Sequence, residues 1–220
     1  MGHVLAVTGT RQEAGVLARH QVQAIAGGSD PENLRRTLME RAAGAGGLIS
    51  YGTCGAVDPS LALGTMVIGK RLTGAFQAEC DKRWVAALQS LLPDAAVGTV
   101  HADGDLVSQA HDKAERARAS AAMAVDMESH IVAQVAAHLN LPFAILRCVS
   151  DVAAAPLPPA VQVMMGPGGE LALGAVARSL WAQPGQAGAF VRTIAGFAKA
   201  FRLLKQGTKQ AGPMLGFDLR

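Results

Sequence analysis

Three carboxylates stand just after short apolar segments of this chain, at Glu13, Glu128 and Asp151. Ligands of open α/β sheets bind outside the carboxyl ends of the strands, so acids at such places are candidates for proton transfer or hydroxyl binding. An Asp beside an apolar strand is partly desolvated, which raises its pKa and suits it to general acid catalysis. A Glu can accept hydrogen bonds from two adjacent hydroxyls, such as those of a ribose.

Each acid also has a plainer interpretation that the residues alone leave open. Glu13 fits a helix N-terminus, where the helix dipole favours acids. Glu128, with Asp126 two residues before it, fits a helix-capping cluster. Asp151 fits an ordinary acid at the start of a loop.

The glycine-rich turn Gly-Thr-Cys-Gly-Ala at residues 52–56 exposes backbone N–H groups and lets a ligand approach closely. It is neither a GxGxxG nor a Walker motif, so neither a dinucleotide nor a nucleoside triphosphate is indicated. Cys54 is open to two interpretations, a nucleophile or, more simply, a small buried thiol. The six histidines have no metal-ligand spacing, so we expect no metal and no cofactor.

Alternating strands and helices are expected to position these residues. The apolar patterns predict strands at 3–8, 47–51, 65–68, 97–101, 123–127 and 143–149. They predict helices at 12–26, 80–92, 129–139, 171–181 and 189–205, and one that starts at Pro31 with Asp30 as its N-cap. This alternation implies an α/β sheet covered on both faces. Residues 153–169 hold four prolines and three glycines, which is typical of a functional or disordered loop.

The composition bounds the class of protein. A chain of 220 residues suits one domain, and a hydrophobic content of 50% excludes a disordered chain. The net charge of +3 is uneven, because residues 191–220 hold six basic residues and one acid, which leaves residues 1–190 with a net charge of −2. The body of the protein therefore has no excess of positive charge, and we expect no nucleic-acid partner.

The cysteines and the N-terminal residues indicate a reduced, cytoplasmic compartment. The three cysteines lack CxxC spacing and do not form a disulfide framework. The first residues lack the basic region and the long apolar region of a signal peptide. No apolar run is long enough to span a bilayer.

Taken in order along the chain, these motifs resemble the nucleoside phosphorylase and nucleosidase superfamily. Glu13 comes first, then the 52–56 turn with Gly-Thr-Met-Val-Ile at 64–68, then AVDMES at 124–129 and LPFAILRCVSD at 141–151. The resemblance covers residues 3–182 and implies a three-layer αβα sandwich around a mixed, partly barrel-like sheet. On this basis residues 1–182 are predicted to form the catalytic domain. Residues 183–220 are predicted to form a basic amphipathic tail, either separate or docked on that domain.

The resemblance implies roles in cleaving the bond between a purine and its ribose. Asp151 matches the acid that protonates the purine at N7, and Ser150 matches a neighbour that orients it. Glu128 matches the carboxylate that holds the ribose hydroxyls, and Met127 a residue that packs on the ribose. Glu13 matches the base that activates water in the hydrolytic branch.

The resemblance also assigns roles to residues near the attacking water and around the ribose and base. Arg147 matches an arginine near the attacking water, and Thr53 and Gly55 match the loop near the ribose and base. Leu106 and Val107 are the candidates for the base-stacking segment, where an aromatic residue usual in the family is missing.

Water is favoured over phosphate as the nucleophile. Phosphorylases of this superfamily commonly place an Arg two residues before the Gly-Thr-Cys-Gly turn, and here that position is Ser50. A phosphate dianion needs fixed donors and positive charge, which a serine does not supply. Arg11 remains an alternative phosphate ligand.

The finer resemblance is to the hopanoid-associated nucleosidases, also called phosphorylases, which take adenine from adenosylhopane and leave ribosylhopane. It rests on Asp-Met-Glu-Ser-His at 126–130, a short segment between Ile68 and Trp84, and Leu-Pro-Pro-Ala at 157–160. The alternatives are a methylthioadenosine/S-adenosylhomocysteine nucleosidase, a futalosine nucleosidase and a phosphate-dependent purine nucleoside phosphorylase. A non-enzymatic nucleoside-binding module would not need this set of acids.

Two apolar features suit a lipid-tailed substrate, although both are also explained by packing on the core. The first, in the loop after Asp151, is the run Val161, Val163, Met164 and Met165. The second is a helical stripe in the tail made of Ile194, Phe197, Phe201 and Leu204, with Arg192, Lys199, Arg202 and Lys205 interleaved. A basic amphipathic helix can lie on the inner face of an anionic membrane, so peripheral membrane contact is one expectation. The resemblance also makes a homodimer an expectation.

Overall fold

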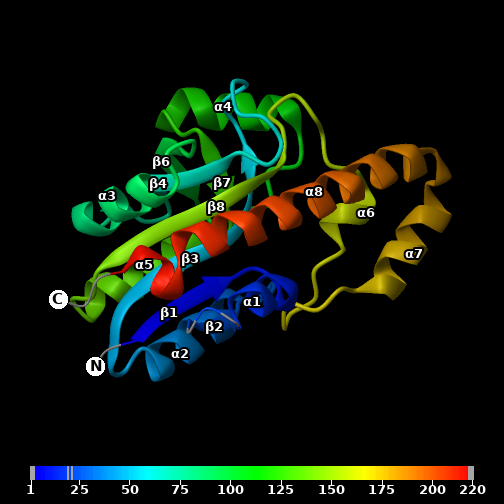
Figure 1. Cartoon of the computed structure of the whole chain (residues 1–220). Helices are drawn as coiled ribbons and strands as arrows, with labels where there is room; N and C mark the ends of the chain where they lie inside the picture. Colours follow the sequence, from blue (N-terminus) through cyan, green and yellow to red (C-terminus); the bar gives the residue numbers. More distant parts are fainter. Residues whose placement is uncertain (1–2, 19, 21, 218–220) are drawn as a thin grey trace.

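The structure, a computed structural model, describes residues 3–18, 20 and 22–217, in which strands and helices alternate (Figure 1). The strands are β1 (His3–Thr8), β2 (Gln23–Ala26), β3 (Ala45–Ala56), β4 (Met66–Gly74), β5 (Ala78–Glu79), β6 (Ala96–Ala102), β7 (Ala124–Asp126) and β8 (Phe143–Asp151). The helices are α1 (Arg11–Leu17), α2 (Pro31–Arg41), α3 (Lys82–Leu91), α4 (Ala110–Ser120), α5 (Ser129–His138), α6 (Pro159–Gln162), α7 (Leu173–Ala182) and α8 (Ala187–Ala211). Short 3-10 turns lie at Pro184–Gln186 and Pro213–Gly216.

Five strands close into a ring. β3 pairs with β8 along most of its length and with β7 at its end. β8 also pairs with β4, β4 pairs with β6, and β6 pairs with β7, which closes the ring. β1 and then β2 extend the sheet from the first half of β3. The β3–β7 and β4–β8 pairs are antiparallel and the other pairs of the ring are parallel. The predicted α/β class with a mixed, partly barrel-like sheet is confirmed.

Helices cover both faces of this sheet. Apolar residues of α2 and α5, such as Leu38 and Ile131, join one core cluster, and residues of α1, α3 and α8, such as Leu17, Leu88 and Leu204, join a second. The strands between them are continuously buried because they face helices on both sides, as β8 shows from Phe143 to Ser150. The predicted three-layer sandwich follows from this packing.

The prediction of one helix over residues 12–26 was wrong. α1 ends at Leu17, and residues 23–26 form β2, whose Ala24 and Ile25 pair in parallel with Ala6 and Val7 of β1. Tertiary pairing decides this short segment, whose Gln and Ala residues have no strong preference for strands. α4 and β5 were not predicted, whereas the predicted start of α2 is confirmed by the Asp30 side chain, which accepts a hydrogen bond from Asn33 N at 3.0 Å.

The C-terminal helix α8 packs along the sheet and runs across one face of the molecule (Figure 1). Ala200, Leu204 and Ala211 are buried in the second core cluster. The Tyr51 hydroxyl of β3 lies 2.6 Å from the Thr208 Oγ, and both groups are buried. Of the two alternatives for the tail, these contacts favour docking on the body. The domain boundary at residue 182 stays a prediction.

Candidate active site

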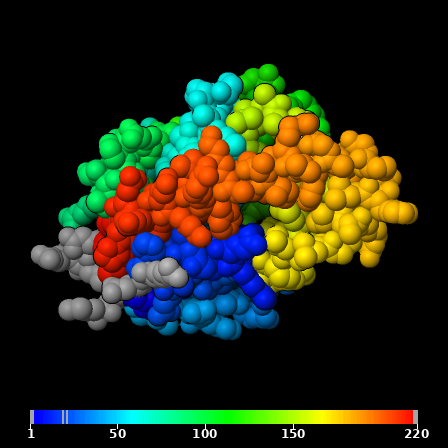
Figure 2. All heavy atoms as spheres, turned by 45° about the vertical axis from the view of Figure 1, so that its right-hand side comes forward, coloured from blue at the N-terminus to red at the C-terminus, as the bar shows by residue number. Residues whose placement is uncertain are grey.

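One cavity of about 760 Å³ opens where β1, β3, β7 and β8 end, and segment 157–171 and α8 enclose its outer part. In the space-filling view α8 lies directly over the N-terminal elements (Figure 2). The structure brings all ten predicted site residues to the lining of this cavity: Glu13, Thr53, Gly55, Leu106, Val107, Met127, Glu128, Arg147, Ser150 and Asp151. Their catalytic and binding roles stay predictions.

Glu13 is buried and fully hydrogen-bonded in the first turn of α1. Its Oε1 accepts from the Thr53 backbone N at 2.7 Å and from the Thr53 hydroxyl at 2.8 Å. Its Oε2 accepts from the Thr10 N at 2.8 Å and from the Thr10 hydroxyl at 3.1 Å. Thr10 and Glu13 thereby form a capping box, so the plainer interpretation of Glu13 also holds. The contacts with Thr53 tie this helix start to β3 and aim the carboxylate at the cavity.

Arg147 on β8 is buried among acceptors. Its Nη2 lies 3.2 Å from Glu128 Oε2, 3.3 Å from Asp126 Oδ1 and 2.6 Å from the Ser50 Oγ. Burial raises the pKa of Glu128 to about 7, although the neighbouring Arg147 guanidinium opposes this rise. The guanidinium therefore orients the Glu128 carboxylate and partly compensates the free-energy cost of burying its charge away from water.

Asp126, the last residue of β7, and Glu128, two residues later, have different roles. Asp126 caps α5, because its Oδ1 accepts from Glu128 N at 3.0 Å and from Ser129 N at 2.8 Å. Glu128 makes no capping hydrogen bond and lines the cavity instead. A Cβ atom placed on Gly9 would lie 3.1 Å from Glu128 Oε1 and 3.4 Å from Glu13 Oε2. Glu13 and Glu128 therefore face the same small space.

Asp151 ends β8 on the other side of the cavity, opposite Gly55 of β3. A Cβ atom at Gly55 would come within 3.1 Å of Asp151 Oδ2, so the glycine leaves room for the carboxylate. The Ser150 hydroxyl lies 3.3 Å from Asp151 Oδ1 and 3.2 Å from Cys54 O. Burial raises the pKa of Asp151, as the sequence predicts, whereas Lys113 lowers it.

Lys113 was missed by the sequence analysis. Its side chain lies in α4, is fully buried, and forms an ion pair with the Asp151 carboxylate. Its Nζ also donates to Val152 O at 3.0 Å and to Ala155 O at 3.1 Å. The residue pattern of α4 carries no signal for this, because the helix is otherwise polar and the partners lie about 40 positions further along the chain.

The outer part of the cavity is lined by residues that only the fold brings together. Leu157, Val161, Met164, Met165 and Leu171 come from the segment after Asp151, and Ile194, Phe197, Ala198 and Phe201 come from α8. Val163, expected in this group, is 42% exposed and lies outside the lining, and Leu204 is buried in the core. Phe197 and Phe201 supply aromatic rings that the Leu106 and Val107 segment lacks.

Ser50, which stands where phosphorylases place an Arg, and Arg11, the alternative phosphate ligand, both have other partners. Ser50 Oγ accepts from Arg147, as given above, and lies 2.8 Å from the Ser129 hydroxyl. Arg11 is largely exposed, donates from Nε to Gly168 O at 2.9 Å and pairs with Glu170 at 3.8 Å. Arg11 is not among the residues that line the cavity.

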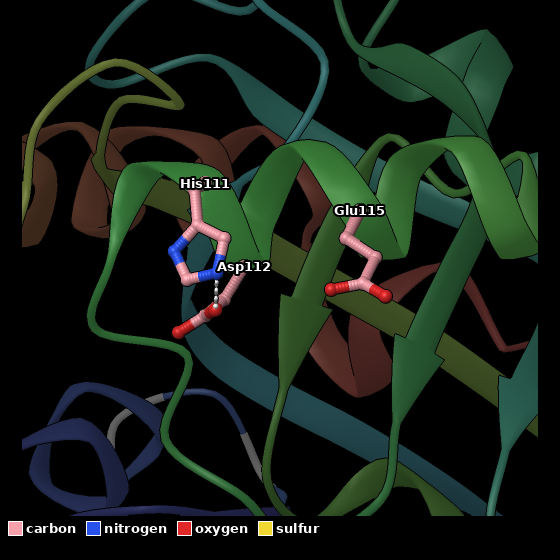
Figure 3. Close-up of side chains that lie close together, drawn as sticks. All are labelled: His111, Asp112 and Glu115. Carbon is pink, nitrogen blue, oxygen red and sulfur yellow. Dashed lines mark ion pairs between the residues drawn. The ribbon is translucent and has the colours of Figure 1, made fainter.

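One group of potential metal ligands lies on the outer surface of α4 (Figure 3). His111 and Asp112 lie 2.8 Å apart, and Glu115 stands one turn along the helix. His111 and Glu115 are exposed, and Asp112 is half-buried. Its position on the solvent side separates it from Lys113, which points inward from the same helix.

The sequence matches the family model of the phosphorylase superfamily over residues 8–163. The chain therefore belongs to the phosphorylase superfamily, as the order of its motifs predicted. Membership confirms the prediction of an enzyme of the purine nucleosidase or phosphorylase type. By sequence, no curated protein matches the chain.

Solved structures share its fold along nearly the whole chain. The futalosine hydrolase of Helicobacter pylori has a TM-score of 0.68 at 15% identity and covers 95% of this chain and 96% of its own. The methylthioadenosine/S-adenosylhomocysteine nucleosidase of Streptococcus pneumoniae, with a transition-state inhibitor, has a TM-score of 0.64 at 20% identity and covers 94% and 98%. The S-adenosylhomocysteine nucleosidase of Streptococcus pyogenes has a TM-score of 0.64 at 17% identity and covers 94% and 97%. Among the described residues, no helix has the length and apolar character needed to cross a membrane.

Proposed function

We propose that the protein hydrolyses the N-glycosidic bond of a purine nucleoside that carries an apolar 5′ substituent. The observation that carries this proposal is that Glu13, Glu128 and Asp151 line one cavity. Its volume of about 760 Å³ is within the range of small-molecule sites. The named fold neighbours include nucleosidases and a hydrolase, and one such nucleosidase from Helicobacter pylori holds 5′-methylthioadenosine in its active site.

The reaction needs one proton donated to the base and one taken from water. As the bond between C1′ and the purine breaks, Asp151 gives its proton to N7, so the base leaves neutral. Water attacks C1′ and loses a proton to Glu13, while Glu128 accepts hydrogen bonds from the ribose hydroxyls. A positioned general acid or base contributes about 10²- to 10⁴-fold to the rate.

The attacking water is proposed to enter by replacing one of the hydrogen-bond donors of Glu13. Four donors already occupy the acceptor positions of this carboxylate, so water must replace one of them. The contact with the Thr10 hydroxyl, at 3.1 Å, is the longest of the four. Arg147 keeps one unused donor, since its buried Nε has no partner among the described residues.

Water rather than phosphate is the proposed nucleophile. The buried cation of the cavity, Arg147, is matched by the Asp126 and Glu128 carboxylates, which leaves no excess charge for a dianion there. Arg11 lies outside the cavity, and Ser50 holds Arg147. The proposed products are therefore the free purine and a free ribosyl compound.

The apolar outer wall supports a hydrophobic 5′ substituent. The loop after Asp151 and the stripe on α8, which the sequence singled out separately, meet in this wall. Apolar residues at this place favour a substituent that leaves water. We propose adenosylhopane as the substrate, with adenine and ribosylhopane as the products.

A second candidate is a substituent that ends in a carboxylate, as in futalosine. Arg202 and Lys205 of α8 also line the cavity, and both are exposed. A carboxylate at the end of an apolar substituent would pair with these cations.

The test measures the free purine base and the ribosyl product by mass spectrometry for adenosylhopane, methylthioadenosine and futalosine, each with and without phosphate. We expect release from adenosylhopane without phosphate and a free ribosyl product. Strict dependence on phosphate would overturn hydrolysis. A preference for methylthioadenosine would overturn adenosylhopane as the substrate, and a preference for futalosine would overturn the apolar specificity.

We also propose that α7 and the first half of α8, called here the apolar arm, contact an anionic membrane surface. Leu173, Trp181 and Val191 on this arm are exposed by 69%, 90% and 66%. Residues 173–199 hold the basic residues Arg178, Arg192 and Lys199 and no acid. Exposed apolar side chains flanked by lysine and arginine are typical of interfacial helices. Ile194 and Phe197, in the first half of α8, also line the cavity.

Vesicle sedimentation tests the membrane contact. The protein should bind vesicles that contain phosphatidylglycerol and leave pure phosphatidylcholine vesicles unbound. Leu173→Ser with Trp181→Ser should weaken binding, whereas Leu91→Ser, at an exposed leucine of α3, should not. If the protein is a dimer by light scattering and the double variant is a monomer, the arm is a dimer interface and the membrane proposal fails.

A further inference from the structure

The buried ammonium group of Lys113 lies behind the carboxylate that the mechanism uses as its acid. Its exposed fraction is zero, and its three acceptors are Asp151 Oδ2, Val152 O and Ala155 O. An ammonium has three donors, so every one of them is used. A lysine buried this completely is uncommon unless it is paired.

Lys113 also connects two walls of the cavity. It stands at the fourth position of α4, which directly follows the segment that carries Leu106 and Val107. The chain after Asp151 returns to that segment, because Leu157 N donates to Ser108 O at 2.8 Å. The Lys113 contacts and this backbone hydrogen bond hold the base-side segment and the turn after β8 together.

We propose that Lys113 is a positioning residue, which orients the Asp151 carboxylate toward the base and sets the proton affinity of that carboxylate. The proposal rests on the proposed function in taking Asp151 as the proton donor. With Oδ2 held by Lys113, Oδ1 is the oxygen left to carry the proton to the purine, beside the Ser150 hydroxyl. The ammonium stabilises the carboxylate that remains once the proton has left, which makes Asp151 a stronger acid.

The other ionisable groups near Asp151 do not supply the positive charge that Lys113 supplies. Cys54 on β3 is kept protonated because burial raises the pKa of its thiol. Arg147, on β8 with Asp151, is paired with Asp126 and Glu128 at the end of β7. On α4 itself, Asp112 and Glu115 stand on the solvent side. The charge that acts on Asp151 is that of Lys113.

The first measurement does not depend on activity. Carbon-13 NMR of the labelled protein follows the titration of the Asp151 carboxyl, which the spectrum of Asp151→Asn assigns. Lys113→Gln removes the positive charge and keeps hydrogen-bond donors. We expect the pKa of Asp151 to rise by roughly one to three units in this variant. An unchanged titration in the folded variant would overturn the proposal.

The second measurement is the pH profile of adenine release. Lys113→Gln should move the alkaline limb to higher pH by the same amount and lower kcat by about tenfold or more, because the acid is weaker and less well oriented. Lys113→Arg should keep the limb near its original place. Arg118→Gln, at an exposed cation of the same helix, should change neither quantity.

The outcomes separate the possible failures. A lower Tm with an unmoved alkaline limb would show a purely structural role for Lys113. If the unaltered protein releases no adenine, the proposed function fails, whereas the NMR titration still decides the role of Lys113. Lys113→Met is the second variant if Lys113→Gln does not fold, and the same upward shift of the Asp151 titration is expected.

Discussion

The Glu13 carboxylate has two functions in this structure, since it caps α1 and faces the cavity with both oxygens hydrogen-bonded. Its position at the third residue of α1 gives the capping contact with Thr10, and the Thr53 contacts come from β3. An acid that sequence reasoning leaves between two interpretations therefore satisfies both. Capping holds the side chain in the orientation that the chemistry needs.

Replacing Glu13 by glutamine tests this at the level of one residue. Glu13→Gln should lower kcat by about 10²- to 10⁴-fold, because the amide cannot accept a proton from water. Its NH2 group would also face the Thr10 or Thr53 donors, so a small loss of stability is expected. Glu32→Gln, in the exposed first turn of α2, is the matched control and should leave kcat unchanged. A Glu13→Gln variant with normal kcat would exclude Glu13 as the base.

The pH dependence of activity follows from two buried acids. Burial raises the pKa of Glu128 to about 7, and Glu128 binds ribose hydroxyls best when ionised. We therefore expect kcat/KM to rise as the pH increases toward about 7 and above. Burial also raises the pKa of Asp151, which must be protonated, so activity should fall as the pH rises through that value.

The Glu128→Gln variant tests the assignment of the acid limb. Its pH–rate profile should lose the limb near pH 7, because the amide does not titrate. An unchanged limb in this variant would assign the limb to another group.

At the scale of elements, the turn of β3 beside α1 requires glycine at position 52. Gly52 has a φ of +141°, and a Cβ there would lie 2.7 Å from Glu13 Oε1. Gly52→Ala should therefore destabilise the protein by about 1–3 kcal/mol and displace the Glu13 carboxylate. Activity should fall together with stability, which chemical denaturation and adenine release measure.

Gly44→Ala, just before the start of β3, is the matched control for Gly52→Ala. Gly44 also has a positive φ, +79°, but no atom lies within 4 Å of the added Cβ. It should lose stability through backbone strain and keep its activity per folded molecule. Equal effects of the two variants on activity would show that the space between Gly52 and Glu13 is unimportant for activity.

The docking of α8 on β3 is a second property of the elements. Tyr51→Phe removes the donor to the Thr208 Oγ, which itself donates to Leu204 O at 2.6 Å. The free energy of unfolding should fall by about 1 kcal/mol, as for one buried hydrogen bond. An unchanged free energy would mean that this contact adds nothing to the docking of α8.

For the whole molecule, the decisive question is whether residues after 186 are an appendage or part of the core. A chain that ends at Gln186 loses Ala200, Leu204 and Ala211, all buried in the second core cluster. It also loses the α8 wall of the cavity. We expect no cooperative thermal unfolding by circular dichroism. A truncated protein that folds and releases adenine would support a separate tail.

Much of the site was predictable because its residues belong to short local patterns. Glu128 and Asp151 each follow an apolar strand, and the order of such motifs is visible in the chain itself. The sequence did not predict which of the neighbouring acids Asp126 and Glu128 caps α5 and which faces the cavity. Only the three-dimensional structure distinguishes the two. Likewise, β2 forms because residues 23–26 pair with β1, and no pattern within these four residues predicts that pairing.

By itself, the sequence determined the alternation of strands and helices, the class of fold and the candidates at the ends of β1, β3, β7 and β8. These follow from periodicity and composition, which act between residues close together in the chain. The tertiary structure alone placed Lys113 behind Asp151, brought α8 into the cavity wall and turned Arg11 away to Gly168. Each of these contacts joins positions about 40 or more residues apart, where packing and electrostatics, rather than local preference, select the partner.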